Sequence, residues 1–308
     1  MSDLPKRVRI HEEGPREGFQ IESAAIPTAE KVRFIEALAR TGVPQIDCVS
    51  YVNPKRVPGM ADADVVARGI HKQPGVRYTG LWLNVRGLER ALELPLDHVG
   101  VVRVTASETF CRRNTGMGVD ETFEEQRRWL RLYRAHGIEI EWAYVMTAFG
   151  CNFEGEVPVA RVVEMVERLK RLEQEEGVRF QGICLADTVG HGTPDSVEQR
   201  IGALRERWPE LALGLHLHDT RGTGIANAWA ALRMGVAQFD STCGGLGGCP
   251  FAGHKGAAGN ICTEDLVYLC HAAGIETGID LHAMAECARM AESIVGHPLP
   301  GKVMHTAI

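Results

Sequence analysis

The feature that most constrains this chain is an alternation of short apolar runs with amphipathic helical segments, repeated along all 308 residues. Runs rich in Val, Ile and Leu that alternate with helices are typical of βα units and a parallel sheet. The predicted strands are Val8–Glu12, Gln45–Val49, Tyr78–Leu83, Val99–Thr105, Ile138–Met146, Gly182–Ala186, Ala212–His218 and Ala237–Thr242. Because no break in composition divides these units, we expect one α/β domain over 1–308, a (β/α)8 TIM barrel rather than a doubly wound sheet.

Helical spacing of apolar residues predicts helices between these strands and after the last one. The clearest are Glu30–Arg40, Asp120–Ala135, Val159–Glu175 and Pro194–Arg207. Thr193, directly before Pro194, is a candidate N-cap. Two C-terminal helices, Leu266–Ala273 and about Leu281–Val295, are predicted within about 263–296, and we expect them at the catalytic face of the barrel.

Composition excludes several classes of partner. The chain has 34 Lys and Arg against 40 Asp and Glu, a net charge of -6, so charge gives no case for nucleic acid or an anionic membrane. The N-terminal stretch lacks the pattern of a signal peptide, and no apolar run is long enough to span a bilayer. Nine cysteines occur without a Cys-x-x-Cys pair. We therefore expect a cytoplasmic globular enzyme with reduced cysteines.

His216 and His218 end the seventh predicted strand, one residue apart. Residues i and i+2 of a strand project from the same face, so both imidazoles point into one place. Such a pair either binds a transition or divalent metal or forms hydrogen-bonded core histidines. Further candidate ligands are needed to favour the metal site over hydrogen-bonded core histidines.

Glu17 is the best third ligand. It follows the first predicted strand beside Arg16, and Gly14 and Gly18 flank the pair, which lets the backbone bend and present two side chains at the barrel mouth. Active sites of such barrels gather at these strand ends, where Asp47 and Asp187 also lie. The alternative for Arg16 and Glu17 is a surface salt bridge.

A glycine-dense segment of about 244–262 follows the eighth strand and is a candidate lid. Within it, Cys249 is held between Gly248 and Pro250, where a thiol could move a proton or act as a nucleophile. Asn260 could add an amide oxygen as a fourth ligand, or could cap a helix. Two His with carboxylate and amide oxygens suit Mg²⁺ or Mn²⁺ better than a closed zinc site.

Taken together, these segments resemble the 3-hydroxy-3-methylglutaryl-CoA (HMG-CoA) lyase family of the metal-dependent lyase and Claisen-condensing barrel superfamily. The resemblance covers most of the chain. The matching motifs are Gly14–Gln20, Asp47–Lys55, Ala186–Gly190, His216–Thr220 and, most specific, Gly244–Phe251.

The resemblance implies a carbon-carbon lyase that cleaves HMG-CoA to acetyl-CoA and acetoacetate, as a homodimer. It implies that Arg16 polarises the thioester carbonyl, with Asp47 and Cys249 as further catalytic residues and Cys249 in proton transfer. The implied ligands of Mg²⁺ or Mn²⁺ are Glu17, His216, His218 and Asn260. The implied substrate-binding residues are Asp187 and Thr188, to which we add Arg221.

Three departures from the family pattern concern the acyl substrate. The family usually has aspartate after the motif arginine and glutamate at the second strand, whereas this chain has Glu17 and Asp47. The lid is two residues longer than the usual lyase loop, and Arg221 stands where the family commonly has tyrosine. A shorter acid, citramalyl-CoA, cleaved to pyruvate and acetyl-CoA, is therefore an alternative substrate. Less favoured alternatives are a Claisen-condensing synthase and a non-catalytic ligand-binding barrel.

Overall fold

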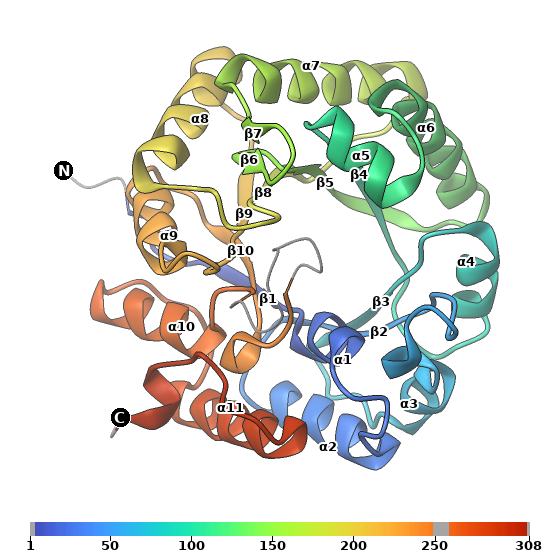
Figure 1. Ribbon diagram of the computed structural model, residues 1–308, viewed down its shortest axis with the longest axis vertical. Helices are drawn as coiled ribbons and strands as arrows, with labels where there is room; N and C mark the ends of the chain where they lie inside the picture. The colour runs from blue at the N-terminus through green and yellow to red at the C-terminus, as the bar shows by residue number, and fades with distance from the viewer. Residues whose placement is uncertain (1–3, 249–258, 307–308) are drawn as a thin grey trace. The chain divides into compact units, whose positions relative to one another are not determined.

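The computed structural model describes residues 4–248 and 259–306 (Figure 1). Eight strands follow the order β3-β2-β1-β10-β9-β8-β5-β4 in one sheet. The pairs β1–β2, β2–β3, β4–β5, β5–β8 and β8–β9 are parallel. Helices separate the strands along the chain. This is the predicted (β/α)8 architecture.

The observed elements match the predicted ones closely. The strands of the sheet are β1 (Arg9–Glu12), β2 (Gln45–Ser50), β3 (Arg77–Leu81), β4 (Val99–Thr105), β5 (Glu139–Met146), β8 (Gly182–Ala186), β9 (Leu213–His216) and β10 (Gln238–Ser241). The helices are α1 (Phe19–Ile21), α2 (Thr28–Ala39), α3 (Ala63–Gly69), α4 (Val85–Leu92), α5 (Glu108–Thr115), α6 (Val119–Ala135), α7 (Val159–Glu176), α8 (Pro194–Arg207), α9 (Gly224–Arg233), α10 (Thr263–Ala272) and α11 (Leu281–Val295). The Thr193 side chain accepts a hydrogen bond from Ser196 N, as predicted for the N-cap of α8.

The sequence analysis missed a two-stranded hairpin, β6 (Gly150–Cys151) and β7 (Gly155–Glu156), because strands of two residues carry no periodicity. The seventh strand also ends earlier than predicted, at His216, and His218 forms an isolated bridge beyond it. In the part of the chain that the structure describes, no helix is long and apolar enough to cross a membrane.

Contacts divide the chain into two compact units. The central unit contains Val99–Gln238, and the terminal unit joins Lys6–His98 to Phe239–Gly248 and to 259–306. The predicted single domain over 1–308 stays a prediction.

In the central unit, helices α6, α7 and α8 line the outer side of β4, β5, β8 and β9 (Figure 1). Arg200 of α8 is fully buried and donates to the carbonyl oxygens of Ala148 (2.7 Å), Val157 (2.5 Å) and Ser196 (3.0 Å). It thereby anchors the chain on both sides of the β6–β7 hairpin, because a buried guanidinium must satisfy its donors internally.

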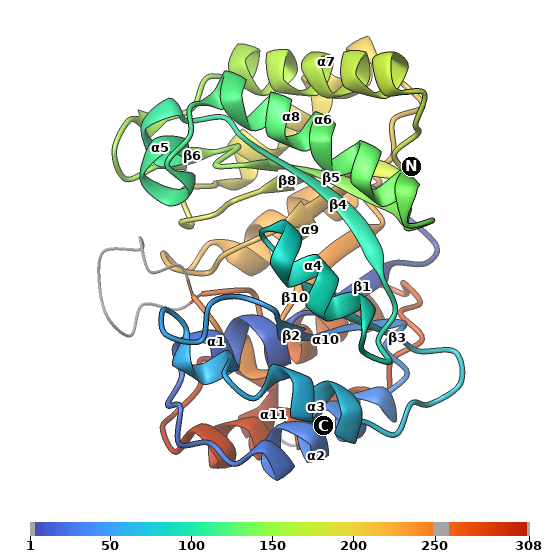
Figure 2. The same cartoon turned by 90° about the vertical axis from the view of Figure 1, so that its right-hand side faces the viewer.

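In the terminal unit, β1, β2 and β3 pair in parallel, and α2, α3, α10 and α11 lie with them in the lower part of Figure 2. Ile10 of β1, Phe34 of α2 and Ile46 of β2 have no solvent exposure. Burial of such side chains is the main stabilising contribution to the unit. Glu12 pairs in register with Ile46, which brings the turn after β1 level with Asp47.

Candidate active site

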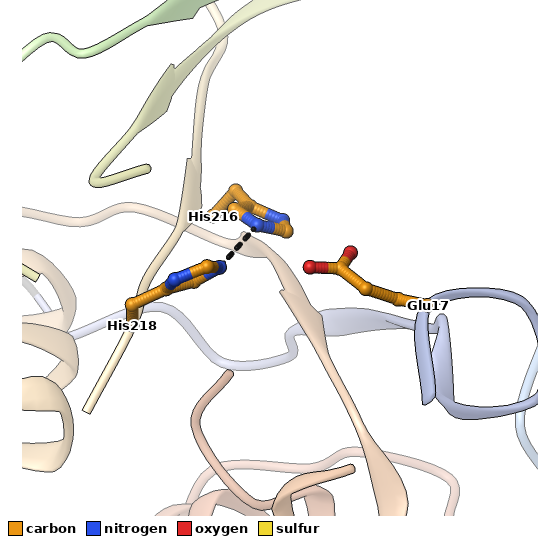
Figure 3. A group of neighbouring side chains, drawn as sticks. All are labelled: Glu17, His216 and His218. Atoms are coloured by element: carbon orange, nitrogen blue, oxygen red, sulfur yellow. Dashed lines mark hydrogen bonds between the residues drawn. The ribbon is translucent and has the colours of Figure 1, made fainter. Parts of the chain in front are cut away.

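The two predicted metal-binding histidines face each other at the end of β9. Nε2 of His216 lies 3.1 Å from Nε2 of His218, and both side chains are buried (Figure 3). The strand holds them because Ala186 and His216 are register partners and Asp187 N donates to His216 O at 2.8 Å. The predicted common face of the two imidazoles is confirmed.

Asp187 lies beside this strand end, within a turn that it organises. Its carboxylate accepts hydrogen bonds from His191 N (2.7 Å) and Gly192 N (2.9 Å), and the side chain has no solvent exposure. Burial raises the pKa of Asp187, although the two amide hydrogen bonds oppose the shift. The carboxylate is therefore held rigidly in the loop after β8.

Thr188 belongs to the same loop, and Arg221 contacts it. Thr188 Oγ1 accepts a hydrogen bond from Thr147 N at 2.8 Å. The exposed Arg221 donates to the carbonyl oxygens of Val189 (2.7 Å) and Gly190 (2.8 Å). Asp187, Thr188 and Arg221 are thus brought together within the central unit.

The terminal unit holds Arg16 and its carboxylates. Arg16 lies in the π-helical turn Gly14–Gly18, directly after β1. Its Nε donates to Asp47 at 2.8 Å, its Nη1 to Glu17 at 3.2 Å, and its Nη2 is 2.9 Å from Glu13. Burial lowers the pKa of Arg16, but these three carboxylates outweigh burial and raise it well above its ordinary value. One guanidinium against three carboxylates leaves a formal charge of about -2, which favours binding of a divalent cation.

Glu17 and Asn260 both lie beside Gly247. A Cβ at Gly247 would stand 2.9 Å from Glu17 Cγ and 3.1 Å from Asn260 Nδ2, and Gly247 has φ +91°. Glycine is required here for both reasons. The terminal unit therefore brings two of the four predicted ligands together.

Asn260 itself has an unusual environment. It has no solvent exposure, and its Nδ2 donates to Leu246 O at 3.5 Å. Its Oδ1 has no hydrogen-bond partner among the described residues. A buried amide oxygen without a donor is costly, and a cation would satisfy it.

The described residues fit a divalent metal by their chemistry. Glu17 offers a carboxylate, His216 and His218 offer imidazoles, and Asn260 offers its unsatisfied oxygen. Figure 3 draws the first three of these side chains. Mixed oxygen and nitrogen donors of this kind suit Mg²⁺ or Mn²⁺. Cys249, the predicted lid thiol, lies outside the described residues.

Three buried residues of functional interest were not singled out from the sequence. Glu12 and Glu264 have no solvent exposure, and burial raises their pKa values to about 7 and about 8. Thr147, after β5, has φ 53°, and its Oγ1 accepts from Ser107 N. A glutamate within an apolar strand was the available signal for Glu12, whereas no local pattern indicates Thr147.

Comparison with known proteins identifies the family of this chain. The family model described as HMGL-like matches residues 7–291. The mitochondrial hydroxymethylglutaryl-CoA lyase of Rattus norvegicus is 41% identical over 286 residues, 93% of this chain and 85% of that protein. The hydroxymethylglutaryl-CoA lyase YngG of Bacillus subtilis is 39% identical over 298 residues, 97% and 96% of the two chains.

Solved structures show the same relationship. The Bacillus subtilis HMG-CoA lyase has a TM-score of 0.89 and 38% identity, with 98% of both chains covered. An HMG-CoA lyase from Acinetobacter baumannii, in complex with coenzyme A and 3-methylmalate, has a TM-score of 0.84 and 36% identity over 98% of this chain and 95% of that one. This chain therefore belongs to the HMGL-like family.

Proposed function

We propose that this chain is a divalent-metal-dependent carbon-carbon lyase that cleaves HMG-CoA to acetyl-CoA and acetoacetate. The observation that carries the proposal is near full-length similarity, at 37 to 41% identity, to lyases named for this substrate. It favours HMG-CoA over citramalyl-CoA. It also favours a lyase over a condensing synthase or a non-catalytic barrel.

Glu17, His216, His218 and Asn260 would hold the metal, which is Mg²⁺ or Mn²⁺ in this proposal. The support is the donor set and the unsatisfied Oδ1 of Asn260. When bound, the cation would supply positive charge that lowers the pKa of the substrate's hydroxyl group.

Arg16 would polarise the thioester carbonyl and stabilise the enolate oxygen. An arginine has five N–H donors. Its Nε donates to Asp47 and its Nη1 to Glu17, and its Nη2 lies 2.9 Å from Glu13 in an ion pair. These contacts fix the guanidinium plane, and two hydrogen bonds do not exhaust five donors, so the guanidinium can also donate to the substrate. Preorganised donors of this kind stabilise charge that develops in the transition state.

The remaining roles follow the family resemblance. Asp47 would act in catalysis through its contact with Arg16 Nε, and Cys249 would transfer a proton. Asp187, Thr188 and Arg221 would bind the acyl-CoA substrate. The support is that Asp187 and Thr188 lie in the loop after β8, and that Arg221, which follows β9, donates to carbonyl oxygens of this loop. Arg221 would add a cation for the substrate's carboxylate.

A side-by-side assay tests the function. The protein is treated with chelator, reloaded with Mg²⁺ or Mn²⁺, and given HMG-CoA and both stereoisomers of citramalyl-CoA. We expect acetoacetate from HMG-CoA only after reloading. Faster cleavage of a citramalyl-CoA isomer would show that citramalyl-CoA, not HMG-CoA, is the preferred substrate. Full activity after exhaustive metal removal would contradict the proposed metal dependence.

The homodimer and the cytoplasmic location stay predictions. Relatives are named as mitochondrial and as cytoplasmic lyases. Light scattering after gel filtration measures the oligomeric state, and fractionation of the source cells measures the location.

A further inference from the structure

Glu12, the last residue of β1, makes hydrogen bonds to three separate segments of the terminal unit. Its Oε1 accepts from Gly14 N and from Cys243 N, both at 2.8 Å. Its Oε2 accepts from Thr263 Oγ1 at 2.6 Å. The carboxyl group has no solvent exposure, so these three donors are its local environment.

Each of the three segments leads into a different part of the proposed site. Gly14 opens the turn that carries Arg16 and Glu17. Cys243 opens the 3-10 turn Cys243–Gly245, which precedes Gly247. Thr263 opens α10, three residues after Asn260. One side chain therefore joins the supports of both ligands that this unit supplies.

Glu264 also holds the turn Cys243–Gly245 by a hydrogen bond. Its Oε2 accepts from Gly244 N at 3.0 Å, one residue after the amide that Glu12 binds. A Cβ at Gly301 would meet Glu264 Oε1 at 2.1 Å, so the C-terminal segment closes over this carboxyl group. Adjacent amides of one turn are thus held by two buried glutamates.

The hydrogen bonds of Glu12 need its oxygens in place but do not need its charge. Two backbone amides donate to Oε1, and the Thr263 hydroxyl donates to Oε2. The same hydroxyl also lies 2.7 Å from Ser241 Oγ. A glutamine amide can accept the two amides through its oxygen and donate to the hydroxyl through its nitrogen. Burial, which raises the pKa of Glu12 to about 7, also favours a neutral group.

We infer that Glu12 is a positioning residue that holds the Arg16–Glu17 turn, the turn at Cys243 and the Asn260 segment in register for metal binding. The inference rests on the proposed function for the identity of the ligands. Groups that orient metal ligands typically contribute about 10- to 100-fold to metal affinity.

The test compares Glu12→Gln with Glu12→Ala. Calorimetric titration of the metal-free protein with Mn²⁺ measures affinity, and kcat and KM for HMG-CoA are measured separately. We expect Glu12→Gln to keep Mn²⁺ affinity within about threefold, and Glu12→Ala to lose about tenfold or more in affinity and in kcat, with a smaller change in KM.

Glu173→Gln is the matched control. Glu173 is also buried, and its Oε1 accepts from a backbone amide, Phe180 N, but it lies in the central unit outside the proposed site. We expect this control to keep the wild-type Mn²⁺ affinity. If Glu12→Ala does not fold, Thr263→Val removes one of the three bonds and should weaken Mn²⁺ binding several-fold.

A folded Glu12→Ala protein with wild-type Mn²⁺ affinity would overturn the inference, and so would a Glu12→Gln protein as weak as the alanine variant. Amide hydrogen exchange at Cys243 and Gly14 adds a readout that needs no catalysis, and exchange should accelerate in Glu12→Ala alone. A wild-type protein that binds Mn²⁺ but does not cleave HMG-CoA would contradict the proposed function and leave the positioning role of Glu12 standing.

Discussion

His216 and His218 lie with their Nε2 atoms 3.1 Å apart, each buried at the end of β9. Between two neutral imidazoles, one Nε2 must donate and the other accept. The same two nitrogens can instead bind a shared cation, which replaces that hydrogen bond by two coordination bonds. The pair is therefore compatible with both states, and metal binding should alter it directly.

Replacement of one histidine should remove most of the metal affinity. His218→Ala deletes one of four proposed ligands, so Mn²⁺ affinity should fall by more than about a hundredfold, beyond the usual effect of an outer hydrogen-bond partner. Calorimetric titration measures it. His71→Ala is the control, because its imidazole is 90% exposed and pairs with Glu36. Unchanged affinity in His218→Ala would exclude this residue as a ligand.

Gly247→Ala should disturb Glu17 and Asn260 together. The new Cβ would stand 2.9 Å from Glu17 Cγ, and φ +91° is unfavourable for alanine. We expect Mn²⁺ affinity to fall about tenfold or more. Gly75→Ala separates the two causes, because Gly75 has φ +82° and no atom within 4 Å of the added Cβ. Equal losses in the two variants would contradict a local effect at Gly247.

Arg16→Met should separate chemistry from metal binding. Loss of a donor that stabilises developing charge typically lowers kcat by about 10² to 10³-fold. Mn²⁺ affinity should be kept or increased, because the carboxylates of Glu13, Glu17 and Asp47 lose their compensating cation. Steady-state kinetics and Mn²⁺ titration measure the two effects, and the exposed Arg33 provides an Arg33→Met control. A normal kcat would remove Arg16 from the mechanism.

Glu176 should make the central unit sensitive to acid. Hydrogen bonds from Arg131 and Arg127, which outweigh burial, lower its pKa from the ordinary 4.5 to about 2. Because the folded state binds the proton less tightly, this stabilisation is complete above pH about 4.5 and is lost as the pH falls through about 2.

Glu176→Gln should therefore lower the free energy of unfolding by roughly 1 to 2 kcal/mol at pH 7. The difference from wild type should shrink as the pH falls toward 2. Urea denaturation at several pH values measures it. Glu175→Gln is the control, because Glu175 contacts only Arg127 among these arginines and is 44% exposed. A difference that does not depend on pH would contradict the ionic origin.

Local patterns predicted most of the fold. The eight strands and the four clearest helices follow from side-chain periods of two and about 3.6 residues, and the N-cap at Thr193 follows from its position before Pro194. The hairpin β6–β7 was missed because its two-residue strands are shorter than any period. The seventh strand was predicted to end at His218, two residues after its observed end at His216. Hydrogen bonding to the neighbouring strand, not composition, decides where a strand ends.

By itself, the sequence determined which residue types stand at the strand ends, and so predicted paired imidazoles, a carboxylate beside Arg16 and a glycine-dense segment. Only the tertiary structure decided how those groups are held. Glu12 and Cys243 are 231 positions apart in the chain, and Glu13 is paired with Arg16 by the π-helical turn after β1. Periodicity reports local backbone geometry, whereas the donor that satisfies a buried carboxyl group depends on which distant segments fold together.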